Sequence, residues 1–306
     1  MIDQFLQNKS HIIINTDLDG IFSGLLLQKY SHLSVAGLCN SRDSIWLRDD
    51  VDSNDCVIVD MYVPSMTCID QHIISIDQPH GASLLASGKT LNPNLFRDRY
   101  FIDPLSYRTK FPFSTTMYLV SLLDVDTQWF DDGGRAHGAS SRDLFFRADD
   151  VLKICIDSPY TKNVSDWWPW LESHARNPAA VQWTRSMIHG TGSDEVGDIR
   201  RRTEMFSMEM GCSRPDGFIT DAILGNRIND VWRNFVSTIG RVTGLGEIDF
   251  SGTYNVWRGR PHRYNVTENN LEELRNTCSI NGNKIISYAF VRAPFSSQNL
   301  SVTHEM

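Results

Sequence analysis

Two carboxylates lie two residues apart directly after an apolar run near the start of the chain. The run Ile12–Ile14 is followed by Asn15 and Thr16, and then by Asp17 and Asp19, with a glycine next. Paired acids where a strand turns into a helix are a common way to hold a metal ion over a phosphate, because hard divalent cations prefer carboxylate oxygens. This segment therefore indicates metal-assisted chemistry on a phosphoester.

The same pattern recurs further along the chain. The apolar run 57–59 ends in Asp60, and the run 73–76 ends in Asp77, with His80 three residues later. Carboxylates and an imidazole, without a thiolate, favour Mn²⁺ or Mg²⁺. Four or five such ligands can hold two ions about 3.5–4 Å apart, and we expect Asp60 to bridge the two.

These side chains can act together only if the elements that carry them bring them to one place. Continuous apolar runs predict parallel strands, buried on both faces, at 11–15, 34–38, 56–60 and 73–77. A helix is predicted over 21–30. Right-handed crossovers put the carboxyl ends of parallel strands on one edge of the sheet, where ligands bind. We therefore expect convergence there of Asp17, Asp19, Asp60, Asp77 and His80.

The rest of the chain predicts an α/β protein of several parts. A helix over 114–123 is expected to begin at Ser114 or Thr115 as N-cap. A run of small residues ends in Asp143 before a helical stretch, residues 160–240 read as mostly helical, and β-like patterns begin at about 247. We expect a parallel-sheet domain with helices on both faces (1–155), a helical connector (156–245) and a small α+β region that binds substrate (246–306).

Composition limits the classes of function. The chain has 306 residues, of which 41% are hydrophobic and 22% charged, as in globular proteins with a full core. A formal net charge of −8 argues against a uniformly basic nucleic-acid binder but not against a local basic groove. The six cysteines have no CxxC spacing and are expected to be reduced and buried. With no signal peptide and no membrane span in view, we expect a cytoplasmic protein.

Four segments together resemble the motifs of the DHH phosphoesterase family, over roughly residues 10–150. They are 16–24, which resembles the Asp-x-Asp-Gly motif; 57–60; 74–80, in the place of Asp-His-His; and 138–143, which resembles Gly-x-x-x-Asp. The family includes RecJ-type exonucleases, oligoribonucleases, cyclic-dinucleotide phosphodiesterases and a class of inorganic pyrophosphatase. The resemblance implies a DHH-like catalytic domain at the N-terminus.

The resemblance also implies roles for individual residues. The implied catalytic residues are Asp17, Asp19, Asp60 and His80. The same four, with Asp77 and Asp143, are the implied ligands of two Mn²⁺ or Mg²⁺ ions. Arg142 and Arg292 would contact the substrate, which would be a short oligonucleotide, a cyclic nucleotide or a single-stranded end. The enzyme would hydrolyse the phosphoester with water activated by two metal ions, and the oligomeric state stays open, a dimer included.

The departures from the family pattern keep two alternatives open. Asn15 stands where many members have a histidine, and the third motif reads Asp-Gln-Pro-His. A catalytically degenerate DHH-like module that binds a nucleotide or a protein is therefore one alternative. The other is a phosphatase of the haloacid-dehalogenase type, in which an Asp directly at the strand end is the nucleophile. Here Asn15 and Thr16 intervene, and Ile21 follows the glycine in place of the usual Thr.

Some chemically capable residues have simpler interpretations. His72 lies before the last predicted strand and is expected to be structural. The tryptophans at 167, 168 and 170 are expected to form a packing cluster, and the run Arg200–Arg202 to lie on a solvated helix face.

Overall fold

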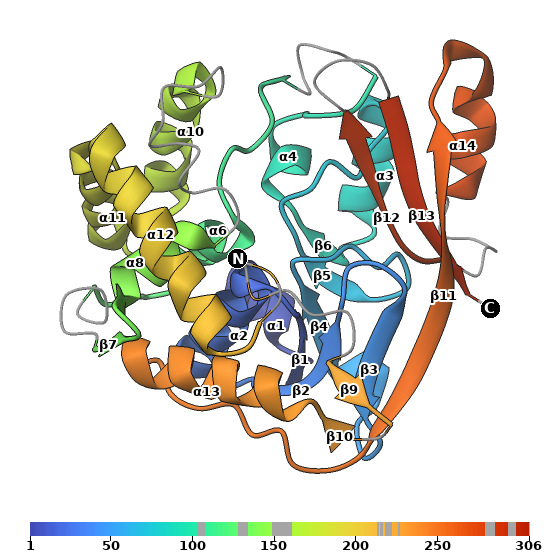
Figure 1. The fold of residues 1–306 in the computed structure, drawn as a ribbon. Coiled ribbons are helices and arrows are strands. Elements are labelled where there is room, and N and C mark those ends of the chain that lie inside the picture. The colour runs from blue at the N-terminus through green and yellow to red at the C-terminus, as the bar shows by residue number, and fades with distance from the viewer. Residues whose placement is uncertain are drawn as a thin grey trace.

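The chain folds as an α/β protein around one mixed, curled sheet of nine strands (Figure 1). The computed structural model describes residues 1–102, 108–127, 134–148, 161–212, 214, 217, 222–225, 227–278, 285–292 and 298–305. Two small antiparallel hairpins accompany the sheet. One joins β7 (Arg135–Ala136) to β8 (Ala139–Ser140), and the other joins β9 (Ile223–Leu224) to β10 (Arg227–Ile228).

The parallel part of the sheet is built around β1 (His11–Asn15). This strand lies between β2 (Ser34–Cys39) and β4 (Cys56–Val59), and both are parallel to it. β5 (Thr67–Ile69) and β6 (Thr90–Leu91) continue the parallel order beyond β4. The first three predicted strands are therefore confirmed. Because the chain leaves β1 first to one side and then to the other, β1 lies at a topological switch point, where ligands of open α/β sheets bind.

The prediction of a strand at 73–77 is wrong. Residues 73–76 are irregular, and the third parallel strand after β1 is instead the three-residue β5. Ile73, Ile74 and Ile76 are buried. The carbonyls of Ile73 and Ile76 accept hydrogen bonds from outside the parallel ladder, from Phe290 N at 2.9 Å and from Ile102 N at 3.0 Å. A short apolar run indicates burial, and burial alone does not distinguish a strand from a packed irregular segment.

The antiparallel part of the sheet joins the two ends of the chain. β3 (Ser44–Arg48) pairs with the first half of β11 (Tyr254–Asn265), whose second half pairs with β13 (Gln298–Glu305). The edge strand is β12 (Ile285–Arg292). Figure 1 shows β11 as a long arch from the central sheet to the C-terminal strands. The last strands thus extend the sheet of the first residues, and the division into three regions stays a prediction.

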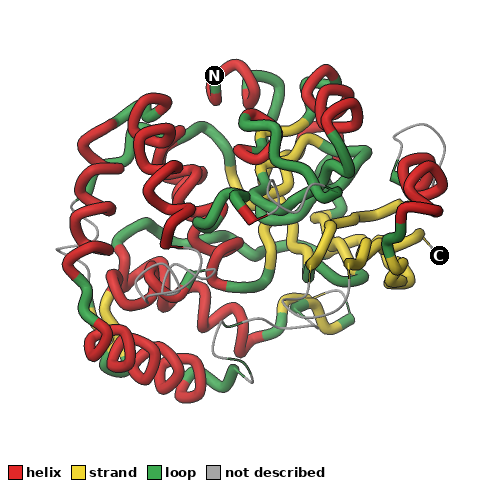
Figure 2. Tube along the Cα trace, turned by 90° about the horizontal axis from the view of Figure 1, so that it is seen from above, coloured by secondary structure: helices red, strands yellow, loops and turns green. Residues whose placement is uncertain are grey.

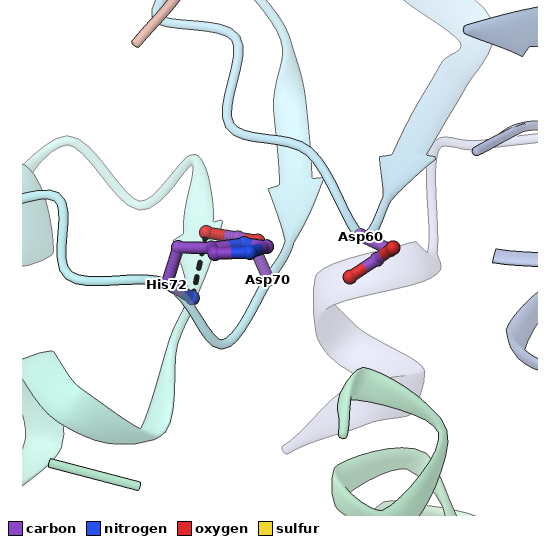
Figure 3. Close-up of side chains that lie close together, drawn as sticks. All are labelled: Asp60, Asp70 and His72. Carbon is purple, nitrogen blue, oxygen red and sulfur yellow. Dashed lines mark hydrogen bonds and ion pairs between the residues drawn. The ribbon is translucent and has the colours of Figure 1, made fainter. Parts of the chain in front are cut away.

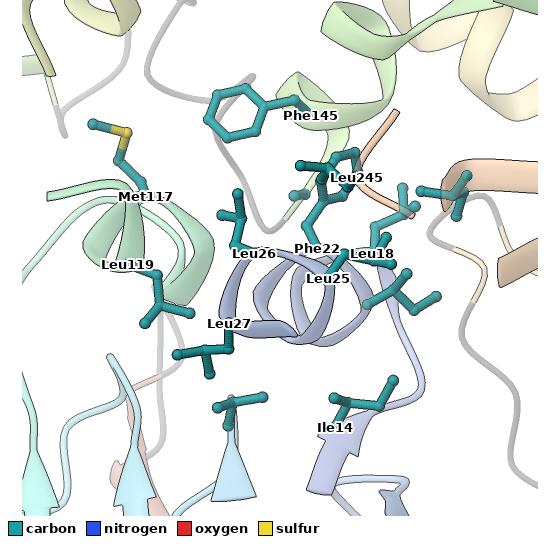
Figure 4. Close-up of a cluster of buried hydrophobic side chains, with 14 of the residues drawn as sticks. Ile14, Leu18, Phe22, Leu25, Leu26, Leu27, Met117, Leu119, Phe145 and Leu245 are labelled. Atoms are coloured by element: carbon teal, nitrogen blue, oxygen red, sulfur yellow. The ribbon is translucent and has the colours of Figure 1, made fainter. Parts of the chain in front are cut away.

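Helices cover both faces of the parallel strands. α2 (Leu18–Tyr30), which begins three residues before the predicted helix, packs with Ile12 and Ile14 in one core. Ile13 points to the second core, which includes Leu84 of α3 (Gln78–Ala86). Figure 4 shows the first core, where α2 lies over β1. A Cβ on Gly24 would come within 2.4 Å of Ile14 Cγ2, so only glycine allows α2 to lie this close to β1.

The described part of residues 160–240 is mostly helical, as predicted. Figure 2 shows these helices gathered on one side of the molecule and the strands on the other. Trp167 and Trp168 are fully buried there, as a packing cluster requires. Among the described residues, no helix is long and apolar enough to cross a membrane. The other helices in the described part of the chain are α1 (Ile2–Leu6), α4 (Pro93–Phe96), α6 (Thr115–Leu122), α8 (Ser141–Arg147), α10 (Thr161–His174), α11 (Pro178–Gly190), α12 (Ser193–Glu209), α13 (Asp230–Thr243) and α14 (Leu271–Thr277), with 3₁₀ turns at Ser53–Asp55 and Glu268–Asn270.

Candidate metal centre

Three potential metal ligands meet at the carboxyl ends of two adjacent parallel strands. Asp60 follows β4, Asp70 follows β5, and His72 lies two residues further on. Each offers one donor atom, and the three atoms lie within 4.8 Å of one another. Figure 3 shows Asp70 and His72 side by side, with Asp60 across from them on the neighbouring segment. This is the edge at which the sequence predicted a metal site.

Asp60 is held in an unusual backbone conformation. Its φ of 59° lies in the left-handed region, which costs a residue other than glycine about 1–3 kcal/mol and often marks functional sites. The carboxylate is 3% exposed. Its Oδ1 accepts a hydrogen bond from Thr115 Oγ1 at 3.0 Å, and its Oδ2 accepts one from Asn15 Nδ2 at 2.9 Å. The backbone and both oxygens are therefore fixed before any ligand binds.

Asp70 fixes the orientation of the His72 ring. His72 Nδ1 lies 2.6 Å from Asp70 Oδ1, and the His72 backbone N–H donates to Asp70 Oδ2 at 3.2 Å. Asp70 is fully buried, whereas 42% of the His72 side chain is exposed. A proton on Nδ1 shared with the carboxylate holds the ring in one orientation and leaves Nε2 as the acceptor nitrogen, the form in which histidine binds a metal ion. His72, which sequence analysis treated as structural, thus belongs to the candidate site.

One asparagine amide joins the acids of β1 and β4. Asn15 Nδ2 donates to Asp17 Oδ2 at 3.0 Å and to Asp60 Oδ2 at 2.9 Å. Asp17 Oδ1 also accepts from Gly20 N at 3.0 Å and so caps α2. Asp17 therefore acts as a helix cap and also lies beside Asp60. The Asn15 amide thus lies between the two carboxylates and neutralises part of the charge between them.

Asp19 belongs to the first turn of α2 and lies against the N-terminus of α6. It accepts hydrogen bonds from the backbone N–H of Thr115 at 2.9 Å and of Thr116 at 2.8 Å, and from Thr116 Oγ1 at 2.6 Å. Ser114 is the N-cap, as predicted. Burial raises the pKa of Asp19, and the hydrogen bonds from Thr116, Asp60 and Thr115 offset this only in part. The close approach of Asp19 and Asp60 concentrates like charge, which a proton or a bound cation can relieve.

The C-terminal strands close a small cleft over these ligands. Asp60, Tyr62 and His72 line it together with residues of the last strands, among them Ser287 of β12 and Ser301 of β13. The cleft has a volume of about 100 Å³, whereas sites for whole small molecules usually measure about 300–1,000 Å³. A space of this size fits a phosphate-sized group.

Asp77 and His80 lie in a different environment. Asp77 caps α3 through His80 N at 3.0 Å and forms an ion pair with Arg275 of α14. His80 Nδ1 accepts a hydrogen bond from Ile76 N at 3.2 Å, and burial lowers the pKa of the ring to about 4. Its Nε2 lies 3.5 Å from the Tyr288 hydroxyl. The group of three donors within 4.8 Å includes neither residue, and their role as ligands stays a prediction.

Asp143 is also held by an arginine. It closes a capping box with Ser140 at the start of α8, and Arg202 donates to its two oxygens at 2.7 and 2.9 Å. Burial alone would raise the pKa of Asp143, but the hydrogen bonds from Arg202 and Ser140 outweigh it and lower the pKa. Arg202, expected on a solvated face, is thus engaged with Asp143, whose role as a ligand stays a prediction.

Of the two arginines predicted to contact the substrate, only Arg142 has a described side chain. Arg142 Nη2 lies 3.1 Å from Glu195 Oε1 and donates to Thr191 Oγ1 at 3.0 Å. The backbone of Arg292 pairs with Gln298 in the β12–β13 ladder, and its side chain lies outside the described residues.

Sequence reasoning missed Asp70 and His72, although a signal was present. Cys68 and Ile69 are followed by Asp70 in the same way that 57–59 are followed by Asp60. The apolar part of β5 is only two residues long, and the longer run at 73–76 obscured it. Comparison with known proteins returned no matching family model, no matching curated protein and no matching solved structure.

Proposed function

We propose that the protein is a metal-dependent phosphoester hydrolase whose metal ligands include Asp60, Asp70 and His72. The observation that supports this most is the convergence of these three donors at the carboxyl ends of β4 and β5, on the side of the sheet next to the switch-point strand β1. The donor set fits Mn²⁺ or Mg²⁺, because it offers carboxylate oxygens and one imidazole nitrogen without a thiolate. Asp17 and Asp19, which lie against Asp60, would complete the ligands of a second ion.

This assignment places the third motif of the DHH resemblance at residues 70–72 in place of residues 77–80. Asp70-Gln71-His72 keeps the first and last residues of Asp-His-His and follows a strand without an insertion. Asp77-Gln78-Pro79-His80 instead begins α3, and Asp77 is held by Arg275. We therefore assign to Asp70 and His72 the roles that the sequence alone suggested for Asp77 and His80.

The residues of the chain prepare the cleft for an anionic group. A bound ion of this class polarises a phosphoryl oxygen and lowers the pKa of water. Asn15 and Thr115 hold the carboxylate of Asp60 in one orientation, so little reorganisation is needed when the substrate arrives. The hydroxyls of Ser287 and Ser301 line the opposite wall and supply donors for the non-bridging oxygens of a phosphate.

The charge on β11 supports a substrate with several phosphates. Arg258, Arg260 and Arg263 are exposed, and none forms an ion pair within the described part of the chain. Arg263 lies directly opposite Ser301, so it shares a sheet face with a residue of the cleft wall. Arg258 and Arg260 alternate onto the other face of β11. In a chain of net charge −8, exposed arginines on both faces of this strand suit a short oligonucleotide or a single-stranded end.

The proposal is tested by hydrolysis with added Mn²⁺. Short oligonucleotides and a bis-aryl phosphodiester are the substrates, and Asp60→Asn, Asp70→Asn and His72→Gln are the variants. Asp198→Asn, which changes an exposed acid on α12, is the matched control. We expect turnover by the wild type and the control and loss in all three site variants. Equal rates in all proteins would contradict the proposal.

One observation favours the alternative of a degenerate binding module. Asn15 Nδ2 already joins Asp17 to Asp60, so the chain carries a neutral donor where a cation would be shared. A protein that binds nucleotide without Mn²⁺ and hydrolyses none of the substrates would support this alternative. The haloacid-dehalogenase type gains no support, since β1 ends at Asn15, two residues before Asp17.

A further inference from the structure

A second cavity, much larger than the acid cleft, lies among the helices. Its volume is about 500 Å³, within the range of about 300–1,000 Å³ that is typical of small-molecule sites. Helices α1, α4, α6 and α10 contribute to its walls. The lining includes Phe96, Tyr118, Leu122, Trp170 and His174, and none of these residues lines the acid cleft.

The walls are rich in aromatic rings at stacking geometry. The rings of Tyr118 and Trp170 are nearly parallel, with an angle of 26° between their planes and 6.3 Å between their centroids. The His174 ring lies 4.6 Å from the Trp170 ring. Phe96 is 37% exposed, a high value for a phenylalanine beside a cavity. These rings pack against one another, and they make the cavity wall mostly aromatic, which favours a flat aromatic ligand.

A tyrosine hydroxyl gives the cavity a polar group. Tyr118 lines the cavity and is 1% exposed, and no hydrogen bond of its hydroxyl is found within the described part of the chain. Across the cavity wall, His174 Nδ1 contacts Trp170 O at 2.8 Å and Ser173 Oγ at 2.9 Å, which leaves the far ring nitrogen available. A ligand with an acceptor near Tyr118 would satisfy the hydroxyl.

From these observations we propose that this cavity is a second binding site, which takes a planar heteroaromatic ring of the nucleobase class. The ring stacks on Trp170, and one of its acceptor atoms receives the hydrogen bond of the Tyr118 hydroxyl. The site is separate from the acid cleft and does not depend on the proposed hydrolysis. It does share α6 with the acids, since the first turn of that helix binds Asp19 and Asp60.

The test is calorimetric titration of the full chain with adenosine and guanosine in the presence of a chelator, so that no metal contributes. Ribose is the control ligand. Tyr118→Phe removes one oxygen atom and should weaken nucleoside binding about 5- to 10-fold, the effect of one hydrogen bond. Trp170→Ala should weaken it about tenfold or more, because the stacking surface is removed.

Two controls separate the cavity from the acid cleft. Tyr62→Phe makes the same chemical change in a tyrosine that lines the cleft, and it should leave nucleoside affinity unchanged. Thermal unfolding checks the fold of each variant; Tyr118→Phe should be about as stable as the wild type, since no hydrogen bond of its hydroxyl is found among the described residues. The proposal is overturned if neither nucleoside binds at millimolar concentration, or if Tyr118→Phe binds as the wild type does.

Discussion

The acids of this protein fall into two groups that differ in what holds their negative charge. Asp60 and Asp19, at the switch point of the sheet, receive hydrogen bonds from neutral donors such as Asn15 and Thr115. Asp77 and Asp143 each hold an arginine of the same chain, Arg275 and Arg202. The second group is neutralised by the fold itself.

This difference in partners indicates which acids bind a metal ion and which stabilise the fold. Carboxylates that lie together among neutral donors gain stability when a cation arrives, whereas an acid already paired with arginine gains little. This comparison supports the proposal that the switch-point acids are the metal ligands and that the arginine-paired acids tie helices together. A substitution among the switch-point acids should therefore affect metal binding and leave stability unchanged. A substitution among the arginine-paired acids should affect stability and leave metal binding unchanged.

The largest expected effect is on activity and follows from Asp60→Asn. Asparagine tolerates the positive φ of this position, so the fold should persist. Loss of the proposed bridging carboxylate should lower the Mn²⁺-dependent rate by about 10²–10³-fold, the scale of removing one main electrostatic interaction. The melting temperature without metal should not fall, because the variant removes like charge beside Asp19. A variant that keeps most of the activity would place Asp60 outside the metal centre.

His72→Gln should reduce Mn²⁺ affinity by about 10- to 100-fold or more, the range seen when the surroundings of a metal are altered. His80→Gln is the matched change in a histidine that lies beside the arginine-paired Asp77, and it should leave Mn²⁺ affinity unchanged. Calorimetric titration of both variants measures the difference. If His80→Gln has the larger effect, the sequence-based assignment of the third motif to Asp77 and His80 is favoured instead.

Asp143→Asn should act on stability and little on metal binding. Its charge-assisted hydrogen bonds to Arg202 are worth about 2 kcal/mol, so denaturant unfolding should show a decrease of that size at pH 7. Because the folded state lowers the pKa of Asp143, this contribution is present above its unfolded pKa and is lost as the pH falls further. A collapse in Mn²⁺ affinity with little change in stability would make Asp143 a ligand.

His80 should make the stability of the protein depend on pH. Its pKa is about 4 when folded, and the ordinary value is 6.5. Between these values the unfolded chain binds a proton that the folded chain does not, so stability falls as the pH drops from about 6.5 to about 4, by up to about 1.4 kcal/mol per unit. His80→Gln should flatten this slope in unfolding curves measured across the range. An unchanged slope would show that another group is responsible.

The smallest expected effect concerns β11. Replacing Arg258, Arg260 and Arg263 by glutamine should weaken single-stranded oligonucleotide binding and reduce its salt dependence, by about 0.7 in the log–log slope for each phosphate that the protein no longer neutralises. Arg201→Gln, which changes an exposed arginine paired with Asp198 on α12, is the control. Identical slopes in both variants would exclude β11 from the substrate path.

Sequence could predict the parts of the site that follow long, simple patterns. The runs before Asn15 and Asp60 predicted β1 and β4 and placed Asp17, Asp19 and Asp60 at one edge. The local N-cap at Ser114 was also readable. The role of Asp70 was hidden because β5 is short and the nearby run 73–76 is buried without being a strand.

Other features depend on contacts between distant residues, which local patterns do not encode. Arg275 is 198 positions from Asp77, and Arg202 is 59 positions from Asp143. Nothing in the neighbourhood of either acid indicates its arginine. The pairing of β11 with β3 likewise places Tyr254 opposite Arg48, which comes from the other end of the chain.

The central claim is that Asp60, Asp70 and His72 hold the metal ion, and anomalous diffraction from crystals soaked in Mn²⁺ tests it most directly. We predict an anomalous peak within coordination distance of all three side chains, about 2.0–2.3 Å from their donor atoms. The same crystals contain Asp77, His80 and Asp143, so both groups are compared in one experiment. A peak at Asp77 and His80, or at Asp143, with none at the switch point would contradict the account.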